Sequence, residues 1–217
     1  MKHRIVTAAQ MKAIEQAGNA HGLPYLQMME RAGMAAYAEL QKQFPQPGSL
    51  LVVCGKGNNG GDGFVIARAA AKDGWNVTAL LAEGEPKTTD AITNFERLHS
   101  LSVNICADCT VLETQHFDVV VDALYGTGFH GALRPSGLAA CGLMNRLHKS
   151  GAFVLAVDLP SGINTDTGEV AEGAAHADLT VTFDSYKPLH VAESSAPLCG
   201  KIVCSDIGIR DEWHPEF

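Results

Sequence analysis

The residues best suited to chemistry lie in a short turn rich in glycine and asparagine, from Gly55 to Gly63. Five of its nine residues are glycine, and Asn58, Asn59 and Asp62 supply the polar side chains. Glycine lets the backbone adopt positive φ and approach a ligand closely. Asparagine carbonyls can hold a hard cation, and their amides can bind hydroxyl groups. The turn predicts a small-molecule site; the alternative is a tight turn with Asp62 capping the following helix.

The same turn fits the dinucleotide fingerprint Gly55-x-Gly57-x-x-Gly60, with Glu83 where a ribose-binding acid is expected. These features define a second hypothesis, an ordinary NAD(P)-dependent oxidoreductase. Against it, Asp62 would compete with a pyrophosphate for the positive end of the helix. The sequence also has no Tyr-x-x-x-Lys pair and no second substrate domain.

Three further polar loops follow apolar stretches in the same way. They begin with Asp122, Asp158 and Asp184, and the last of them contains Lys187. In an open α/β sheet, ligands bind beyond the carboxyl ends of the strands. A single Asp at a strand end is usually a cap, but several such loops in one chain predict a ligand crevice.

These loops need a scaffold in which strands and helices alternate. Apolar runs predict strands at 50–54, 76–81, 103–106, 117–124, 153–157, 179–183 and 201–204. Helical spacing predicts helices at 7–21, 25–43, 89–100 and 138–149, and another after the glycine-rich turn. Thr7 and Gln10 form a capping-box pattern in the first helix.

This alternation predicts a three-layer αβα sandwich around a Rossmann-like, doubly wound, mostly parallel sheet. Two N-terminal helices precede the sheet and are expected to cover one of its faces, with dimerisation as the alternative. The length of 217 residues predicts one domain over 1–217. Within it we expect an N-terminal helical segment, 1–47, and a Rossmann-like core, 48–217.

Composition narrows the class of protein. The net charge of −8 argues against a nucleic-acid surface, and no run of 18 apolar residues is present to span a membrane. The N-terminus lacks the apolar core of a cleavable targeting segment. The six cysteines indicate buried, reduced thiols and a cytoplasmic protein. Cys106 and Cys109 have C-x-x-C spacing, but without a second pair they do not favour a redox or metal role.

Segments along nearly the whole chain resemble the NAD(P)H-hydrate epimerase family, which repairs nicotinamide cofactors hydrated at the reduced ring. The matching segments are Gln10-Met11, Met28 to Gly33, Gly57 to Gly63, Asp122 to Gly128, Asp158 to Gly162, and Thr180 to Phe183 with Lys187. Two residues depart from the pattern. Arg31 stands where many relatives are expected to carry Asn, and His130 where some carry Lys, which argues against an essential role for position 130.

The resemblance implies that the chain epimerises the R and S forms of hydrated NADH or NADPH and is a homodimer. Because the sequence ends at Phe217, without the dehydratase domain fused to many relatives, a separate dehydratase is expected to consume the S epimer. The implied substrate contacts are Asn58, Asn59, Gly60, Gly61, Asp62, Gly126, Thr127, Gly128, Phe129, His130, Gly131, Ala132, Asp158 and Lys187.

The resemblance also implies a potassium ion at Asn59, Asp122 and Ser161. Amide, carboxylate and hydroxyl oxygens suit an alkali cation rather than a soft metal. The alternative for Asp122 and Ser161 is ordinary hydrogen bonding within the loops.

Epimerisation needs a group that protonates the departing hydroxyl and deprotonates the incoming water, and Asp158 is our candidate. Partial burial is expected to raise the pKa of Asp158 toward the useful range. Its alternative role is to cap the turn before Pro160. Lys187 either positions phosphate, tunes Asp158, or is an ordinary surface lysine. A third hypothesis for the whole chain is a non-catalytic binding module, because relatives of this domain resemble scaffolds in some eukaryotic complexes.

Overall fold

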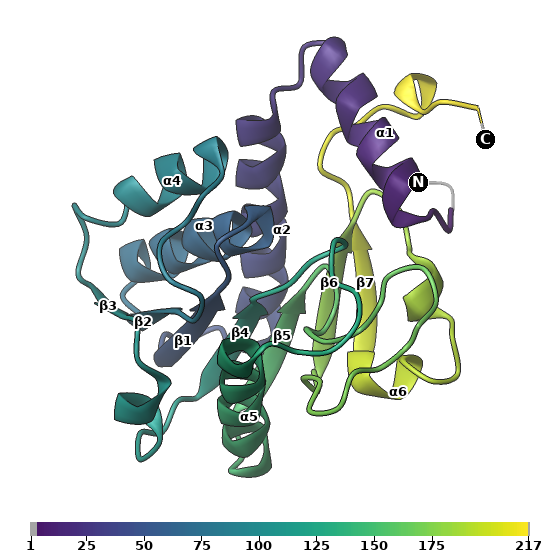
Figure 1. Ribbon diagram of the computed structural model, residues 1–217. Coiled ribbons are helices and arrows are strands. Elements are labelled where there is room, and N and C mark those ends of the chain that lie inside the picture. Colours follow the sequence, from purple (N-terminus) through teal and green to yellow (C-terminus); the bar gives the residue numbers. More distant parts are fainter. Residues whose placement is uncertain (1–3, 217) are drawn as a thin grey trace.

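Residues 4–216, which the computed structural model describes, form a sheet of seven strands in the order β3-β2-β1-β4-β5-β6-β7 (Figure 1). The strands are β1 (Ser49–Cys54), β2 (Asn76–Leu81), β3 (Val103–Cys106), β4 (Val119–Ala123), β5 (Phe153–Val157), β6 (Leu179–Phe183) and β7 (Lys201–Ser205). Every neighbouring pair is parallel, so the sheet is parallel throughout rather than mostly parallel.

Helices cover both faces of this sheet. They are α1 (Ala8–Ala20), α2 (Tyr25–Gln43), α3 (Asn58–Lys72), α4 (Thr89–Glu96), α5 (Pro135–Lys149) and the short α6 (Ala196–Cys199). Figure 1 shows α2, α3 and α4 on one side of the sheet and α5 on the other. Side chains alternate along β1, so Leu50 and Val52 join the core beneath α2 and α3, whereas Leu51 and Val53 join the core beneath α5. The predicted three-layer sandwich is confirmed.

The two N-terminal helices have different positions. The long helix α2 packs along α3 and reaches β5, β6 and β7, which confirms that it covers one face of the sheet. The predicted capping box opens α1: the Thr7 hydroxyl accepts from the Gln10 amide at 3.2 Å, and the Gln10 side chain accepts from the Thr7 amide at 2.8 Å. Helix α1 contacts the C-terminal η3 turn (Asp211–Trp213).

One local prediction is wrong, because α3 begins at Asn58 and not after the glycine-rich turn. Gly57 is its N-cap, so Asp62 lies in the second helical turn and caps nothing. The early start depends on tertiary packing: a Cβ on Gly60 would lie 1.9 Å from the Gly55 carbonyl oxygen. Close approach between strand and helix therefore explains this glycine better than loop flexibility does. Helix α4 also ends earlier than expected, at Glu96.

Within residues 4–216, none of the helices has both the length and the apolar character that crossing a bilayer requires. The six cysteines all lie in this part of the chain and are free. Burial raises the pKa of Cys106 and of Cys109, which disfavours the reactive thiolate form.

Candidate active site

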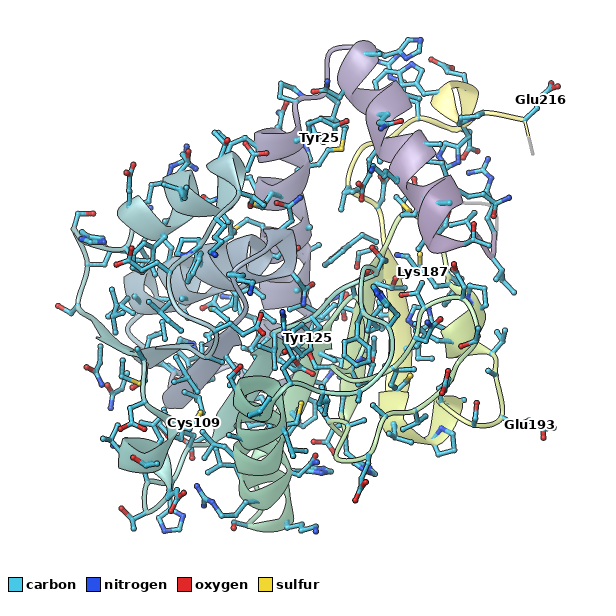
Figure 2. The ribbon with its side chains drawn as sticks, viewed as in Figure 1. Tyr25, Cys109, Tyr125, Lys187, Glu193 and Glu216 are labelled. Atoms are coloured by element: carbon cyan, nitrogen blue, oxygen red, sulfur yellow. The ribbon has the colours of Figure 1, made fainter. Side chains whose placement is uncertain are left out.

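A cleft of about 670 Å³ opens beyond the carboxyl ends of β1, β4, β5 and β6. This is the edge at which ligands bind in doubly wound sheets, and the volume is typical of small-molecule sites. Most of the expected substrate contacts line it: Asn58, Asn59, Asp62, Gly126, Thr127, Gly128, Phe129, His130, Ala132, Asp158 and Lys187. Figure 2 shows Tyr125 and Lys187 at this edge, with Tyr25 on α2 above them.

The loops after β1 and β4 meet at the point where the strand order reverses. Asn59 joins them, because its side-chain amide donates to the Tyr125 carbonyl at 3.1 Å. The first turn of α3 directs unpaired N–H groups toward the cleft, as any helix N-terminus does. Gly60 and Gly61 do not line the cleft; their lack of a Cβ allows α3 to pack against Gly55 and Met29. Gly131 also lies outside the lining and has a φ of +75°.

Asp158 combines an unusual backbone conformation with two side-chain partners. Asp158 and Asp184 are the two non-glycine residues with positive φ among the described residues, and such strain concentrates at functional sites. The Asp158 carboxylate accepts from the Lys187 ammonium at 2.6 Å and from the Thr182 hydroxyl at 2.7 Å. Its partners are therefore side chains from β6 and the following loop, and the alternative role as a turn cap is wrong.

The expected pKa of Asp158 is also wrong in direction. Burial alone would raise this pKa, but the Lys187 ammonium and the hydrogen bonds from Lys187 and Thr182 outweigh burial and hold the pKa below its usual range. Lys187 is only 1% exposed and also donates to Thr182 and to the Phe183 carbonyl. It is not a surface lysine, and its position fits the expectation that it tunes Asp158.

His190 is a contributor that the sequence did not reveal. It ends the η2 turn (Pro188–His190) and links the two halves of the ion pair. Its Nδ1 accepts from the Lys187 amide and its Nε2 lies 3.0 Å from the Asp158 carbonyl, so the Nε2-protonated tautomer satisfies both bonds. Burial lowers the pKa of His190 to about 4, which keeps the ring neutral. The Lys-Pro-x-His spacing was the one signal available in the sequence.

Two further carboxyl groups face the ion pair without hydrogen-bond partners among the described residues. They are Asp62 on α3 and Glu15 on α1, and both line the cleft. Burial, with the nearby Asp158 charge, raises the pKa of Asp62 well above its usual range. Burial raises the pKa of Glu15 to about 7, although Lys187 opposes that rise. Glu15 was missed because helical spacing alone marks no residue of α1 as facing a ligand.

Asp122 and Ser161 lie beneath the cleft and do not line it. Asp122 is fully buried; it accepts from the Ser161 hydroxyl at 2.6 Å and from the Ser161 amide at 2.7 Å. Ser161 in turn accepts from the Tyr125 amide at 2.9 Å. Burial raises the pKa of Asp122 to about 6 despite these donors. The hydrogen bonding within the loops, which was the alternative role for Asp122 and Ser161, is therefore present.

The Glu83 carboxylate is engaged at the rim of the cleft. It accepts from Arg134 at 2.7 Å and from the Tyr125 hydroxyl at 2.9 Å. A ribose-binding acid needs a free carboxylate oxygen, and Lys56 lies 3.9 Å from the other oxygen of this one. These contacts weaken the oxidoreductase hypothesis.

The two residues that depart from the family pattern have surface positions. His130 is exposed at the cleft rim, and its Nδ1 lies 3.1 Å from the Gly128 carbonyl. Arg31 donates to the Ile207 carbonyl at 3.1 Å and so holds the C-terminal segment against α2.

A parallel sheet of this order, with a cleft at its reversal point and a buried ion pair lining that cleft, defines a Rossmann-like domain with a site for a nucleotide-sized ligand. The chain belongs to the family described as YjeF-related protein N-terminus, whose family model matches residues 25–189.

Curated relatives of two lengths are similar to this chain. It is 35% identical over 213 residues to an NAD(P)H-hydrate epimerase of Limosilactobacillus fermentum, covering 95% of this chain and 98% of that protein. It is 38% identical over 215 residues to a bifunctional NAD(P)H-hydrate repair enzyme, Nnr, of Pyrobaculum aerophilum, covering 95% of this chain. The chain spans 42% of the length of that bifunctional relative.

A solved structure has the same fold. The crystal structure of yeast ynu0 superimposes with a TM-score of 0.78 over 94% of this chain and 88% of the yeast chain, at 22% sequence identity. At that identity the likeness concerns the fold alone.

Proposed function

We propose that this protein is an isomerase that interconverts the R and S epimers of hydrated NADH and NADPH. The observation that carries the proposal is the buried Asp158–Lys187 pair, which lines the same cleft as the Asn58–Asp62 segment. The name of the Limosilactobacillus relative, which this chain matches over almost its whole length, supports it.

The reaction needs no redox step. The substrate carries its hydroxyl on a ring carbon bonded to nitrogen, so loss of that hydroxyl as water leaves a cation stabilised by the nitrogen lone pair. Water that returns to the opposite face inverts the centre. Asp158, kept ionised by Lys187, stabilises the cation and accepts the proton that the incoming water releases. Lys187, fixed by Thr182 and Phe183, holds the carboxylate in place.

The test follows epimer exchange by NMR in oxygen-18-labelled water, with and without the protein. We expect exchange above the uncatalysed rate, one labelled oxygen gained per inversion, and unchanged absorbance of intact NADH. A wild-type protein that does not accelerate exchange, yet is stabilised by the hydrated cofactor in a thermal shift, would instead be a binding module.

We also propose that a potassium ion binds at Asn59, Asp122 and Ser161. The donor set fits a hard cation: Asn59 Oδ1 has no hydrogen-bond partner among the described residues, and Asp122 Oδ2 accepts a single hydrogen bond. The Tyr125 backbone contacts both Asn59 and Ser161, and the neighbouring Leu124 amide donates to Asp122, so the three side chains adjoin one stretch of backbone. Such an ion would supply positive charge beside a buried carboxylate and join the loops after β1, β4 and β5.

Potassium binding is tested by melting the protein in potassium, sodium and choline chloride at equal ionic strength. We expect a higher melting temperature in potassium alone, and loss of that difference in Asn59→Ala. Equal melting in the three salts would remove the ion from the proposal.

The assembly is also proposed: a homodimer that supplies the S epimer to a separate dehydratase. The bifunctional relative, more than twice as long as the matched region, supports a functional link between the two activities. Light scattering at working concentration tests the dimer, and a coupled assay with an added dehydratase tests the supply of its substrate.

A further inference from the structure

The proposed reaction requires a proton donor as well as a base. A hydroxyl leaves the ring only when it takes up a proton, and that proton must come from a protonated group. Asp158 is held in its ionised form by Lys187, which suits a base and disfavours a donor. The structure should therefore hold a second proton-transfer group near the same cleft.

Glu15 has the position required of that group. It belongs to α1, whereas Asp158 follows β5, so the two carboxyl groups reach the cleft from different elements. Glu15 forms no hydrogen bond or ion pair with another described residue, unlike Glu83, which Arg134 and Tyr125 engage. A free carboxyl group that lines a cleft is available to a ligand.

We infer that Glu15 is the second catalytic acid–base group of this site and acts on the ring face opposite Asp158. The inference rests on the proposed function. In one direction, the carbon–oxygen bond breaks as the hydroxyl takes the Glu15 proton and leaves as water. A water on the other face then forms the new carbon–oxygen bond and gives its proton to Asp158. In the reverse direction the two groups exchange roles.

The charges around Glu15 are consistent with this role. The groups that face it are Lys12 on α1, Asp62 on α3, Asp158, Asp184 and Lys187. Burial, with the Asp158 and Asp184 carboxylates, raises the pKa of Glu15 to about 7, against the two lysines. A group that is half protonated near neutral pH is an efficient acid in one direction and base in the other. Burial raises the pKa of Asp62 well above its usual range, which favours the protonated form and suits hydrogen bonding to the substrate.

The test compares Glu15→Gln with wild type in the epimer-exchange assay across pH. We expect kcat to fall at least about 100-fold, as for loss of a general acid, and KM to change less than threefold. The wild-type rate in the direction that Glu15 serves as acid should decline above neutral pH, and this limb should disappear in Glu15→Gln. Glu15→Asp should recover part of the rate.

Gln16 provides the matched control, because it is the exposed neighbour on the same helix. Gln16→Glu should leave the rate unchanged. The double variant Glu15→Gln, Gln16→Glu keeps the net charge but moves the carboxyl group to the outer face, and it should be as slow as Glu15→Gln.

Two results would overturn the inference while leaving the proposed function intact. One is a Glu15→Gln variant with the kcat and pH profile of wild type. The other is a rise in KM alone, with weaker stabilisation by hydrated NADPH in a thermal shift, which would assign Glu15 to substrate binding. A wild-type protein without exchange activity would instead contradict the proposed function itself.

Discussion

Two aspartates near the carboxyl ends of adjacent strands, Asp122 within β4 and Asp158 directly after β5, have opposite environments. Asp122 is enclosed by neutral donors from Ser161 and Leu124, and burial outweighs these hydrogen bonds and raises its pKa to about 6. Asp158 is met by the Lys187 ammonium, and its pKa falls below the usual range. Both carboxylates are buried, so burial alone does not explain the difference.

The difference comes from a residue 29 positions away in the chain. Lys187 lies in the loop after the neighbouring strand β6 and places a cationic side chain beside Asp158 but not beside Asp122. A buried carboxylate that receives neutral donors stabilises the loops around it. A buried carboxylate that pairs with a cationic side chain and also lines a cleft is suited to catalysis. The comparison predicts that changes at Asp158 remove most of the reaction, whereas changes around Asp122 lower stability and leave most of the reaction intact.

The largest effect is expected from Asp158→Asn. We expect kcat for epimer exchange to fall about 1,000-fold, because the site loses its base. The variant also leaves Lys187 buried without an anionic partner, which should cost about 3–5 kcal/mol of unfolding free energy. NMR exchange rates and urea denaturation measure the two losses.

The double variant Asp158→Asn, Lys187→Met separates the loss of activity from the loss of stability. Removing the unpaired ammonium should restore much of the stability and none of the activity. If the double variant recovered exchange along with stability, Asp158 would be structural, and the contrast with Asp122 would be lost.

The next largest effect is expected from Ser161→Ala, on the Asp122 side. The change removes the hydroxyl that donates to Asp122 and accepts from Tyr125. Loss of a buried partner costs about 1–3 kcal/mol of unfolding free energy, and we expect kcat to stay within tenfold of wild type. Thr180→Val is the matched control, because that buried hydroxyl donates to the Cys199 carbonyl and does not line the cleft. A fall in kcat as large as that of Asp158→Asn would contradict the division between the two aspartates.

The sequence was sufficient to predict the strands of the sheet, because buried parallel strands appear in it as continuous apolar runs. All seven predicted strands are present, and four of their loops meet at one cleft. The start of α3 was not predictable, since a helix through Gly60 and Gly61 depends on contacts with Gly55 and Met29. The local glycine content indicated a loop, but tertiary packing stabilises a helix there.

The same distinction applies to the site. Asp158 could be chosen because strand-end residues of a doubly wound sheet converge. The direction in which the pKa of Asp158 is shifted could not be predicted, because it depends on whether Lys187 points inward or toward solvent. Glu15 gave no local signal, because it is an acid on an amphipathic helix, and His190 gave only its Lys-Pro-x-His spacing. Their roles depend on which loops pack around them.

An effect confined to acid pH is expected from His190→Gln, which tests the residue that supports Asp158 and Lys187. The folded pKa of His190, about 4, lies below the ordinary value of 6.5. Between these values the unfolded chain binds a proton that the folded chain does not, so stability falls as pH falls from 6.5 to 4. Over this range His190 should account for about 3 kcal/mol of acid destabilisation. Urea denaturation at several pH values should show a shallower decline in His190→Gln. An unchanged slope would mean that His190 takes up its proton in the folded protein.

The smallest effect is expected from His130→Ala. His130 lines the same cleft but is exposed. Among the described residues, its ring has one hydrogen-bond contact, with the Gly128 carbonyl. It therefore has neither the burial of Asp122 nor the charged partner of Asp158, and the comparison predicts that neither stability nor kcat changes measurably. KM should change by less than about threefold, since an exposed rim contact exchanges with water at little net cost. A tenfold loss of kcat would show that lining the cleft is sufficient for a role in the reaction, and that burial with a charged partner is not the feature that distinguishes Asp158.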